Sequence, residues 1–214
     1  MSVRKLPFDE PTGFACPPPN LPDNVREIVR IFRAEGSYVY LVGGCVRDLL
    51  LGREPHDYDL ALSVGVDDVV SICRRHGIEY QRPYAFISHV VAWSGGSIDL
   101  DTIAGGSLKE DLAARDITIN SLAYDMDAQT IIDYMGGIED LEEGLVRFNN
   151  RDSLGENPHN MLRALRFSLE LGFRIEKASF EAMQANVSSF SSISPDVLVR
   201  YMEKLLRGGR DFFV

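Results

Sequence analysis

The sequence predicts an α+β region followed by an all-helical region, from three observations. A short apolar run over residues 38–42 is followed by two glycines and a short helical pattern. Further along, two runs with the alternation of strands are joined by a Ser-Gly-Gly turn. Beyond residue 150 the apolar spacing becomes that of helices. We therefore expect a mostly irregular leader over residues 1–21, an α+β domain over residues 22–150 and a helical domain over residues 151–214.

The composition is that of an ordinary globular protein, with 214 residues, 45% of them apolar and 25% charged. No apolar run approaches the roughly 20 residues that span a bilayer, and residues 1–11 lack the apolar core of a signal peptide. The three cysteines, Cys16, Cys45 and Cys73, follow no metal-binding spacing and indicate reduced thiols. We expect a cytoplasmic protein without a membrane partner.

The net charge bears on the class of partner. Tight nonspecific binding to nucleic acid needs Lys and Arg to displace counterions from phosphates. Here 32 acidic residues outnumber 22 basic ones, for a formal net charge of −10. This balance argues against a protein that coats nucleic acid, but it leaves room for a local basic patch around an active site.

The remaining elements are predicted from local patterns. Ser107, with Glu110 three residues later, has the spacing of a capping box at a helix start. Asn157 is in a position to cap a later helix, with Pro158 at its first turn. Helices are expected over residues 23–35, 46–51, 67–76, 107–113, 138–143, 157–169, 180–187 and 196–206. Strands are expected over residues 38–42, 57–62, 85–93, 97–103, 130–135 and 146–148.

The turn Gly43-Gly44 is the first feature with chemical content. Glycine lets backbone N–H groups approach a ligand closely, and the start of the next helix favours an anion. Arg47 lies in the first turn of that helix, where its guanidinium can grip the same anion. A Gly-Gly pair alone is usually only a turn, so the prediction of a phosphate-binding turn depends on the residues that come after it in the chain.

Those residues include a pair of carboxylates, Asp57 and Asp59, on an expected strand. Residues i and i+2 of a strand point to one face, where two carboxylates repel each other unless cations bridge them. Mg²⁺ binds carboxylates together with substrate phosphates, and two such ions about 3.5–4 Å apart can clamp both oxygens of a phosphoryl transfer. Asp99 and Asp101 form a second such pair, for which a solvated strand edge is the plain alternative.

The stretch from Leu41 to Leu62 resembles the signature of the tRNA nucleotidyltransferase and bacterial poly(A) polymerase family, within the polymerase-beta-like nucleotidyltransferases. The likeness, to the bacterial type of CCA-adding enzyme, runs from about residue 24 to about residue 207. It implies a nucleotidyltransferase head with a small mixed sheet and a helical neck. It also implies transfer of a nucleotide from a ribonucleoside triphosphate, ATP or CTP, to the 3′ hydroxyl of an RNA such as tRNA, with two Mg²⁺ ions and release of pyrophosphate.

The resemblance also implies roles for single residues. Asp57 and Asp59 would hold the metal ions, and the family's third acidic residue, usually Glu, falls at Asp99, with Asp101 as the competing choice. Triphosphate contacts are implied for a set of glycines and arginines: Gly43, Gly44, Arg47, Arg115, Arg163 and Arg166. Asp116 would orient Arg115 or the sugar, although an Arg beside an Asp is more often a surface ion pair.

The chain departs from the family in its nucleotide-reading helix. Asn157 stands where the family has Asp, and Asn160 stands where the family has Arg. Arg offers only donors and ionised Asp only acceptors, whereas each Asn offers both and is shorter than Arg. The pair is expected to read a base differently, weakly or not at all.

Two other functions remain open at this point. The same chemistry could act on another acceptor, such as a short RNA, a nucleotide or a protein hydroxyl, because the tRNA-gripping body and tail of full-length relatives are missing. The chain is either part of a longer protein or a naturally minimal enzyme. A catalytically idle nucleotide-binding module is the non-enzyme alternative, which retention of the acidic positions opposes. A dinucleotide-binding dehydrogenase is excluded because Gly43-Gly44 lacks the G-x-G-x-x-G pattern.

Overall fold

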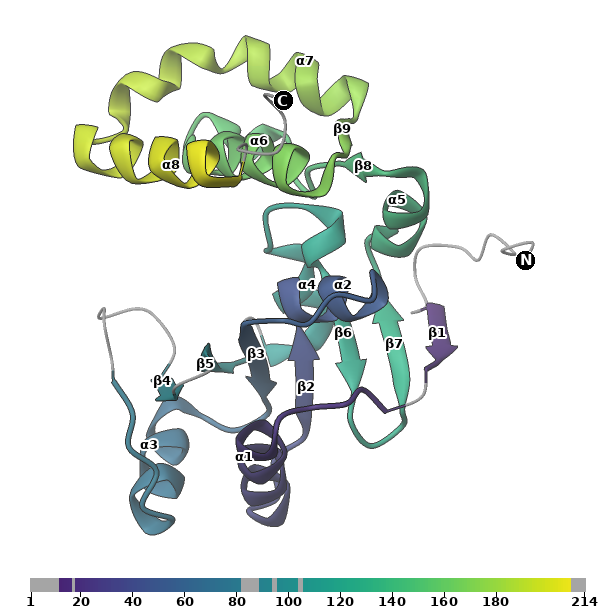
Figure 1. Cartoon of the computed structure of the whole chain (residues 1–214), viewed down its shortest axis with the longest axis vertical. Helices are drawn as coiled ribbons and strands as arrows, with labels where there is room; N and C mark the ends of the chain where they lie inside the picture. Colours follow the sequence, from purple (N-terminus) through teal and green to yellow (C-terminus); the bar gives the residue numbers. More distant parts are fainter. Residues whose placement is uncertain (1–11, 17, 82–88, 94–95, 104–105, 209–214) are drawn as a thin grey trace. The chain divides into compact units, whose positions relative to one another are not determined.

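The computed structural model describes residues 12–16, 18–81, 89–93, 96–103 and 106–208 (Figure 1). The chain forms two compact units, one within residues 1–113 and 120–135, the other within residues 114–119 and 136–214. The division therefore falls before the expected boundary at residue 150. The reason is that Ile117 and Ile119 are fully buried in the core of the second unit, against which Leu141 also packs.

The first unit is built on a seven-stranded sheet in the order β1-β7-β6-β2-β3-β5-β4. Its strands are β1 (Thr12–Ala15), β2 (Val39–Val42), β3 (Asp57–Leu62), β4 (His89–Trp93), β5 (Gly96–Thr102), β6 (Leu122–Asp125) and β7 (Thr130–Asp133). Only β3 and β5 pair in parallel, and every other pair is antiparallel. The expected mixed sheet and the β4–β5 hairpin are confirmed, while residues 85–88 of the expected strand lie outside the described residues.

One strand lies where the sequence predicted a mostly irregular leader. β1 pairs with β7 at the edge of the sheet, with Thr12 opposite Asp133. The proline and glycine content of the leader indicated loops, but a four-residue edge strand needs only a partner that offers free backbone groups. Tyr124 adds to this edge, because its hydroxyl donates to the carbonyl of Cys16 at 3.3 Å.

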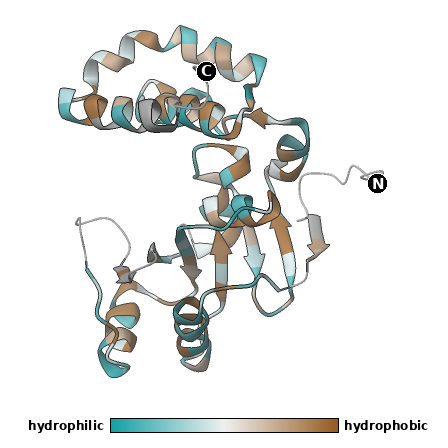
Figure 2. Ribbon diagram, in the orientation of Figure 1, coloured by the Kyte–Doolittle hydropathy of each residue, from teal (hydrophilic) through white to brown (hydrophobic). Residues whose placement is uncertain are grey.

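Four helices accompany the sheet: α1 (Asp23–Ala34), α2 (Gly44–Leu50), α3 (Val66–Arg75) and α4 (Leu108–Ala113). α1 contacts β2 and α3 contacts β5, and the apolar side of each is buried, as in Val25 and Ile72. The ribbon colours of Figure 2 show both hydrophilic and hydrophobic residues along α1 and α3, while β2 is largely hydrophobic. The predicted amphipathic helices are thus confirmed.

α4 covers part of the opposite face of the sheet. Its Leu112 is fully buried in a small core with Val42, Ala61 and Ala123. The hydrogen bond from Glu110 to Ser107 in the predicted capping box at its start is confirmed. The Glu110 N–H donates to the Ser107 hydroxyl at 3.2 Å, and that hydroxyl donates to the Glu110 carboxylate at 2.8 Å.

The second unit is mainly helical, with α5 (Gly137–Glu143), α6 (His159–Leu171), α7 (Lys177–Ala185) and α8 (Pro195–Gly208). Short 3-10 helices occur at η2 (Thr118–Asn120), η3 (Asp152–Leu154) and η4 (Val187–Ser192). The expectation of an all-helical neck is wrong at one place. Gly172 has a φ of 71° and ends α6, and β9 (Arg174–Ile175) then pairs in parallel with β8 (Leu145–Val146). None of the helices that the structure describes is long and apolar enough to cross a membrane.

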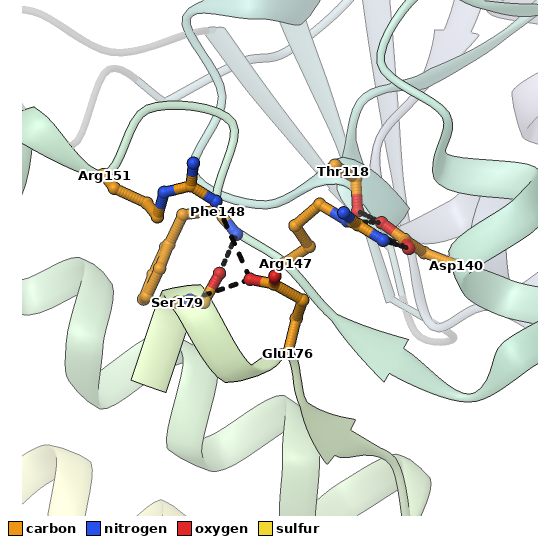
Figure 3. Close-up of polar contacts among 7 residues, drawn as sticks. All are labelled: Thr118, Asp140, Arg147, Phe148, Arg151, Glu176 and Ser179. Carbon is orange, nitrogen blue, oxygen red and sulfur yellow. Dashed lines mark hydrogen bonds and ion pairs between the residues drawn. The ribbon is translucent and has the colours of Figure 1, made fainter. Parts of the chain in front are cut away.

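A buried carboxylate ties the second unit together (Figure 3). Asp140 on α5 is 1% exposed and accepts hydrogen bonds from the Arg147 guanidinium, the shortest at 2.8 Å, and from the Thr118 hydroxyl at 2.5 Å. Because both oxygens accept from the guanidinium and Oδ2 also accepts from the hydroxyl, the burial of the carboxylate is compensated. Thr118 thereby fixes an earlier segment of the chain to α5, and Arg147 fixes the residues that follow β8.

This network yields a prediction about stability. Arg147→Ala leaves the Asp140 carboxylate buried with only the Thr118 hydroxyl, and we expect it to lower the free energy of unfolding by about 3 kcal/mol. Urea denaturation followed by circular dichroism measures the change. Arg151→Ala is the matched control, because its 3.7 Å pair with Glu176 is longer and the arginine is 45% exposed. It should cost less than about 0.5 kcal/mol, and equal losses in the two variants would contradict the assignment.

Candidate active site

The parallel register of β3 and β5 assembles the predicted carboxylates. Asp59 lies directly opposite Asp99, and Asp57 lies opposite Ser97. Alternation along each strand places all four residues on one face, the face that α4 covers further along. Asp57 is exposed, while Asp59 and Asp99 are half-buried. The site therefore lies where the helical cover of the sheet gives way to solvent.

The same register bears on the choice between Asp99 and Asp101. Asp101 lies opposite Ala61, two residues further along β5 and next to the small apolar core under α4. Asp99 is therefore the carboxylate directly opposite Asp59, and the register favours it over Asp101 as the third acidic residue of the cluster.

Two carboxylates of this cluster, Asp57 and Asp99, have no basic partner among the described residues. Among the described residues, neither of these carboxylates is in an ion pair with Lys, Arg or His. Burial raises the pKa of Asp99, and the nearby charges of Asp101 and Asp57 raise it further. In the described part of the chain no three His, Cys, Asp or Glu side chains converge closely enough to hold a metal ion as they stand. Oxygen donors are nevertheless the ligands that Mg²⁺ prefers, so the donor set suits such an ion.

The Gly43-Gly44 turn joins β2 to α2. Gly43 has φ 77° and ψ −138°, a backbone conformation that side chains with a Cβ rarely adopt. Its own N–H donates to the carbonyl of Leu122 at 2.9 Å and so holds the turn against β6. Gly43 thus allows the backbone conformation of the turn, whereas Gly44 begins the helix whose N-terminus is expected to face the anion.

Arg47 is more enclosed than the sequence suggested. It is 7% exposed, and its Nε and Nη2 contact Asp48 Oδ1 at 2.9 and 2.8 Å. Its Nη1 donates to Asn120 Oδ1 at 2.6 Å. A Cβ on Gly44 would lie 3.4 Å from Nη2, so the guanidinium packs along the turn itself. Asn120 was not singled out from the sequence, since no local pattern links two residues so far apart.

In the second unit, two of the predicted residues contact each other. Arg163 Nε donates to Asp116 Oδ2 at 2.6 Å, and the Asp116 side chain is 8% exposed. Asp116 is therefore paired with Arg163 of α6 and is not only the sequence neighbour of Arg115. Burial lowers the pKa of Arg163, but the charge and hydrogen bond of Asp116 outweigh it with help from the Tyr201 hydroxyl, so the pKa is raised. Arg166 lies over the Phe167 ring at 4.3 Å and 3.6 Å from Glu170.

The two departures from the family motif lie at the start of α6. The helix begins at His159 with Pro158 at the N-cap and no side-chain cap, so the predicted capping role of Asn157 is wrong. The Asn157 carbonyl instead accepts from the Asn160 N–H at 3.1 Å. Asn157 is exposed and Asn160 half-buried, and neither amide side chain bonds another described residue. Both amides are available to a ligand.

Comparisons with known proteins match this architecture. Residues 39–103 and 92–147 match the family described as the poly A polymerase head domain. The CC-adding tRNA nucleotidyltransferase of Halalkalibacterium halodurans is 35% identical over 182 residues, which is 85% of this chain and 48% of that protein. Poly(A) polymerase I of Salmonella typhi is 32% identical over 219 residues, or 90% of this chain and 47% of that protein. The chain spans about half the length of the curated relatives it matches.

Solved structures give the same result. The CCA-adding enzyme of Thermotoga maritima complexed with tRNA-CCA has a TM-score of 0.76 at 28% identity, over 87% of this chain and 48% of that one. A CCA-adding enzyme in complex with ATP has a TM-score of 0.77 at 28% identity, with the same coverage of 87% and 48%. The polymerase-beta-like nucleotidyltransferase fold expected from the sequence is confirmed.

The carboxylate cluster should cost stability when no divalent cation is bound. We expect Asp99→Asn to raise the free energy of unfolding at neutral pH by about 0.5 kcal/mol, because like charges directly opposite across neighbouring strands destabilise a sheet. The raised pKa of Asp99 means that the folded state binds this proton more tightly than the unfolded state, so stability falls as pH rises through that range. Urea denaturation in EDTA at neutral and at acidic pH measures the gain, which should vanish once Asp99 is protonated in both states.

The control for this prediction is Asp68→Asn in the first turn of α3, where an exposed carboxylate complements the helix dipole. This change should leave stability unchanged or lower it slightly. A loss of stability in Asp99→Asn at neutral pH would show that the carboxylate is compensated in the folded state.

Proposed function

Because the chain belongs to the family of the poly A polymerase head domain, we propose that it transfers a nucleoside monophosphate from a ribonucleoside triphosphate to an RNA 3′ hydroxyl, without a template and with release of pyrophosphate. The observation that carries the proposal is the register that sets Asp59 beside Asp99 on the face of Asp57. The names of the relatives, CC-adding tRNA nucleotidyltransferase and poly(A) polymerase I, support an RNA end as acceptor. The relatives solved with ATP and with CTP support these two nucleotides as substrates.

In this proposal Asp57, Asp59 and Asp99 would hold two Mg²⁺ ions. Such ions, when bound, lower the pKa of the attacking hydroxyl and stabilise the negative charge of the leaving pyrophosphate. The protein's own contribution is to keep the three carboxylates on one rigid face, which supplies position and electrostatic stabilisation. β3 and β5 provide this rigidity, because both strands are paired on each side within the sheet.

Nucleotide contacts are proposed for residues of each unit taken by itself. In the first unit, Gly43 and Gly44 form the turn that faces the triphosphate. We assign Arg47 to hold that turn, because its guanidinium donates hydrogen bonds to Asp48 and Asn120. In the second unit, contacts with the nucleotide are assigned to Arg115, Asp116, Arg163, Arg166, Asn157 and Asn160. Asp116 orients the Arg163 guanidinium through a hydrogen bond at 2.6 Å, which suits an arginine that binds phosphate.

The carboxylates provide the direct test of the reaction. Asp57→Ala and Asp59→Ala should abolish transfer while the fold is retained, and Asp99→Asn should lower the rate at least about 100-fold. Asp101→Asn is the matched control on the same strand and should cost much less. Radiolabelled ATP, CTP, GTP or UTP is incubated with Mg²⁺ and a panel of RNAs that includes tRNA lacking its 3′ end. Rates within about tenfold of wild type in Asp57→Ala or Asp59→Ala would contradict the site. A larger loss of rate in Asp101→Asn than in Asp99→Asn would make Asp101 the third acidic residue.

Base choice gives a second prediction. Two amides in place of a charged pair remove charge-assisted hydrogen bonds, which are roughly twice as strong as neutral ones. We expect the chain to discriminate among bases less sharply than its relatives, or to prefer another base. Asn157→Asp combined with Asn160→Arg should shift incorporation toward C and A by about 1–3 kcal/mol per restored base contact, as measured by single-nucleotide addition with all four triphosphates.

A matched control separates base reading from added charge. His159→Arg places an arginine in the same turn of α6 at an exposed position and should leave base choice unchanged. If the unaltered chain already adds C and A with high discrimination over G and U, the two asparagines are adequate for reading the base and the idea is wrong.

A further inference from the structure

Ser97 makes two hydrogen bonds to Asp57, one of the candidate metal ligands. No pattern in the sequence indicates a function for Ser97. It is the second residue of β5 and lies opposite Asp57 in the parallel register. Its hydroxyl donates to Asp57 Oδ1 at 2.7 Å, and its backbone N–H donates to the same oxygen at 3.2 Å. One residue therefore engages one carboxylate oxygen twice.

The geometry restricts the carboxylate. Two donors that converge on Oδ1 prevent the side chain from rotating unless both hydrogen bonds break. The 2.7 Å contact has the usual length of an O–H···O hydrogen bond, and such a bond to an ionised carboxylate is stronger than a neutral one. Within the described residues, Oδ2 of Asp57 accepts no hydrogen bond. One oxygen is thus anchored and the other is presented to solvent.

Asp57 differs from the other candidate ligands in its exposure to solvent. Asp59 faces a second carboxylate, Asp99, and is held in place by its half-buried position on the sheet. Asp57 begins β3 and is exposed, so its side chain would otherwise lose rotamer freedom at the moment a cation binds. A hydrogen-bond partner that orients the ligand beforehand removes part of this cost, as in metal sites generally.

We propose that Ser97 is a positioning residue that orients the Asp57 carboxylate and presents its Oδ2 to the divalent cation of the reaction. The inference rests on the proposed function, because it takes Asp57 as a metal ligand. Ser97 itself does not touch the cation or the substrate. Its effect is on how tightly the cation is held and not on the chemistry of transfer.

The test uses Mn²⁺ as the probe on the full chain, with free Mn²⁺ followed by electron paramagnetic resonance. Ser97→Ala keeps the backbone donor, loses the hydroxyl and should weaken Mn²⁺ binding about tenfold. Ser97→Thr keeps a hydroxyl on a residue that suits strands and should restore affinity to within about twofold of wild type. Ser71→Ala is the matched control, since its hydroxyl donates to the Asp67 carbonyl on α3 at 2.8 Å, and it should leave binding unchanged.

Two further measurements separate positioning from a structural role. Thermal unfolding without divalent cation should be alike in wild type, Ser97→Ala and Ser97→Thr. In transfer assays, Ser97→Ala should raise the Mg²⁺ concentration for half-maximal rate about tenfold and leave the rate at saturating Mg²⁺ near that of wild type.

The outcomes are distinguishable. Unchanged Mn²⁺ affinity in Ser97→Ala, or a loss that Ser97→Thr does not restore, overturns the role of Ser97 and leaves the proposed function standing. Absence of Mn²⁺ binding by the wild-type chain overturns the metal site of the proposed function and this inference with it. A tenfold weakening in Ser97→Ala with restoration in Ser97→Thr supports both.

Discussion

The parallel pairing of β3 with β5 is the constraint on which the first unit depends. Side chains alternate along each strand, so the register that buries Leu60 beside Leu100 on one face also sets Asp59 beside Asp99 on the other. A shift by one residue would expose the apolar set and bury the carboxylates. Burial of the apolar face therefore enforces the proximity of charges that repel each other.

The candidate site combines several features that cost stability. Asp99 is a half-buried carboxylate whose neighbours raise its pKa, and Gly43 has a backbone conformation that favours glycine. Gly43 directly follows Val42, which packs with Leu112 of α4. Departures from the rules of a stable core are expected where a protein binds a ligand or catalyses a reaction. Both features adjoin Asp59, because Val42, which precedes Gly43, and Asp99 are its partners on the two neighbouring strands.

In the second unit, two carboxylates with little exposure organise the segment that runs from residue 114 to residue 119. Asp116 holds Arg163 of α6, and Asp140 of α5 holds both Arg147 and Thr118. Each carboxylate is compensated by a guanidinium, so neither is left buried without a partner. The Arg163 guanidinium is thereby held in place, one helical turn after Asn160.

Local pattern determined what the sequence could predict by itself. The alternation that puts Asp57 and Asp59 on one face, the apolar stripe of α1 and the Ser107–Glu110 capping box are all set within a few residues. Only the tertiary structure decided which residues meet across the chain: Asn120 with Arg47, 73 residues apart, Asp116 with Arg163, 47 apart, and Ser97 with Asp57, 40 apart. It also favoured Asp99 over Asp101 as the partner of Asp59. These pairings depend on strand register and helix packing, which result from burial of the whole core and leave no signal in the spacing of neighbouring residues.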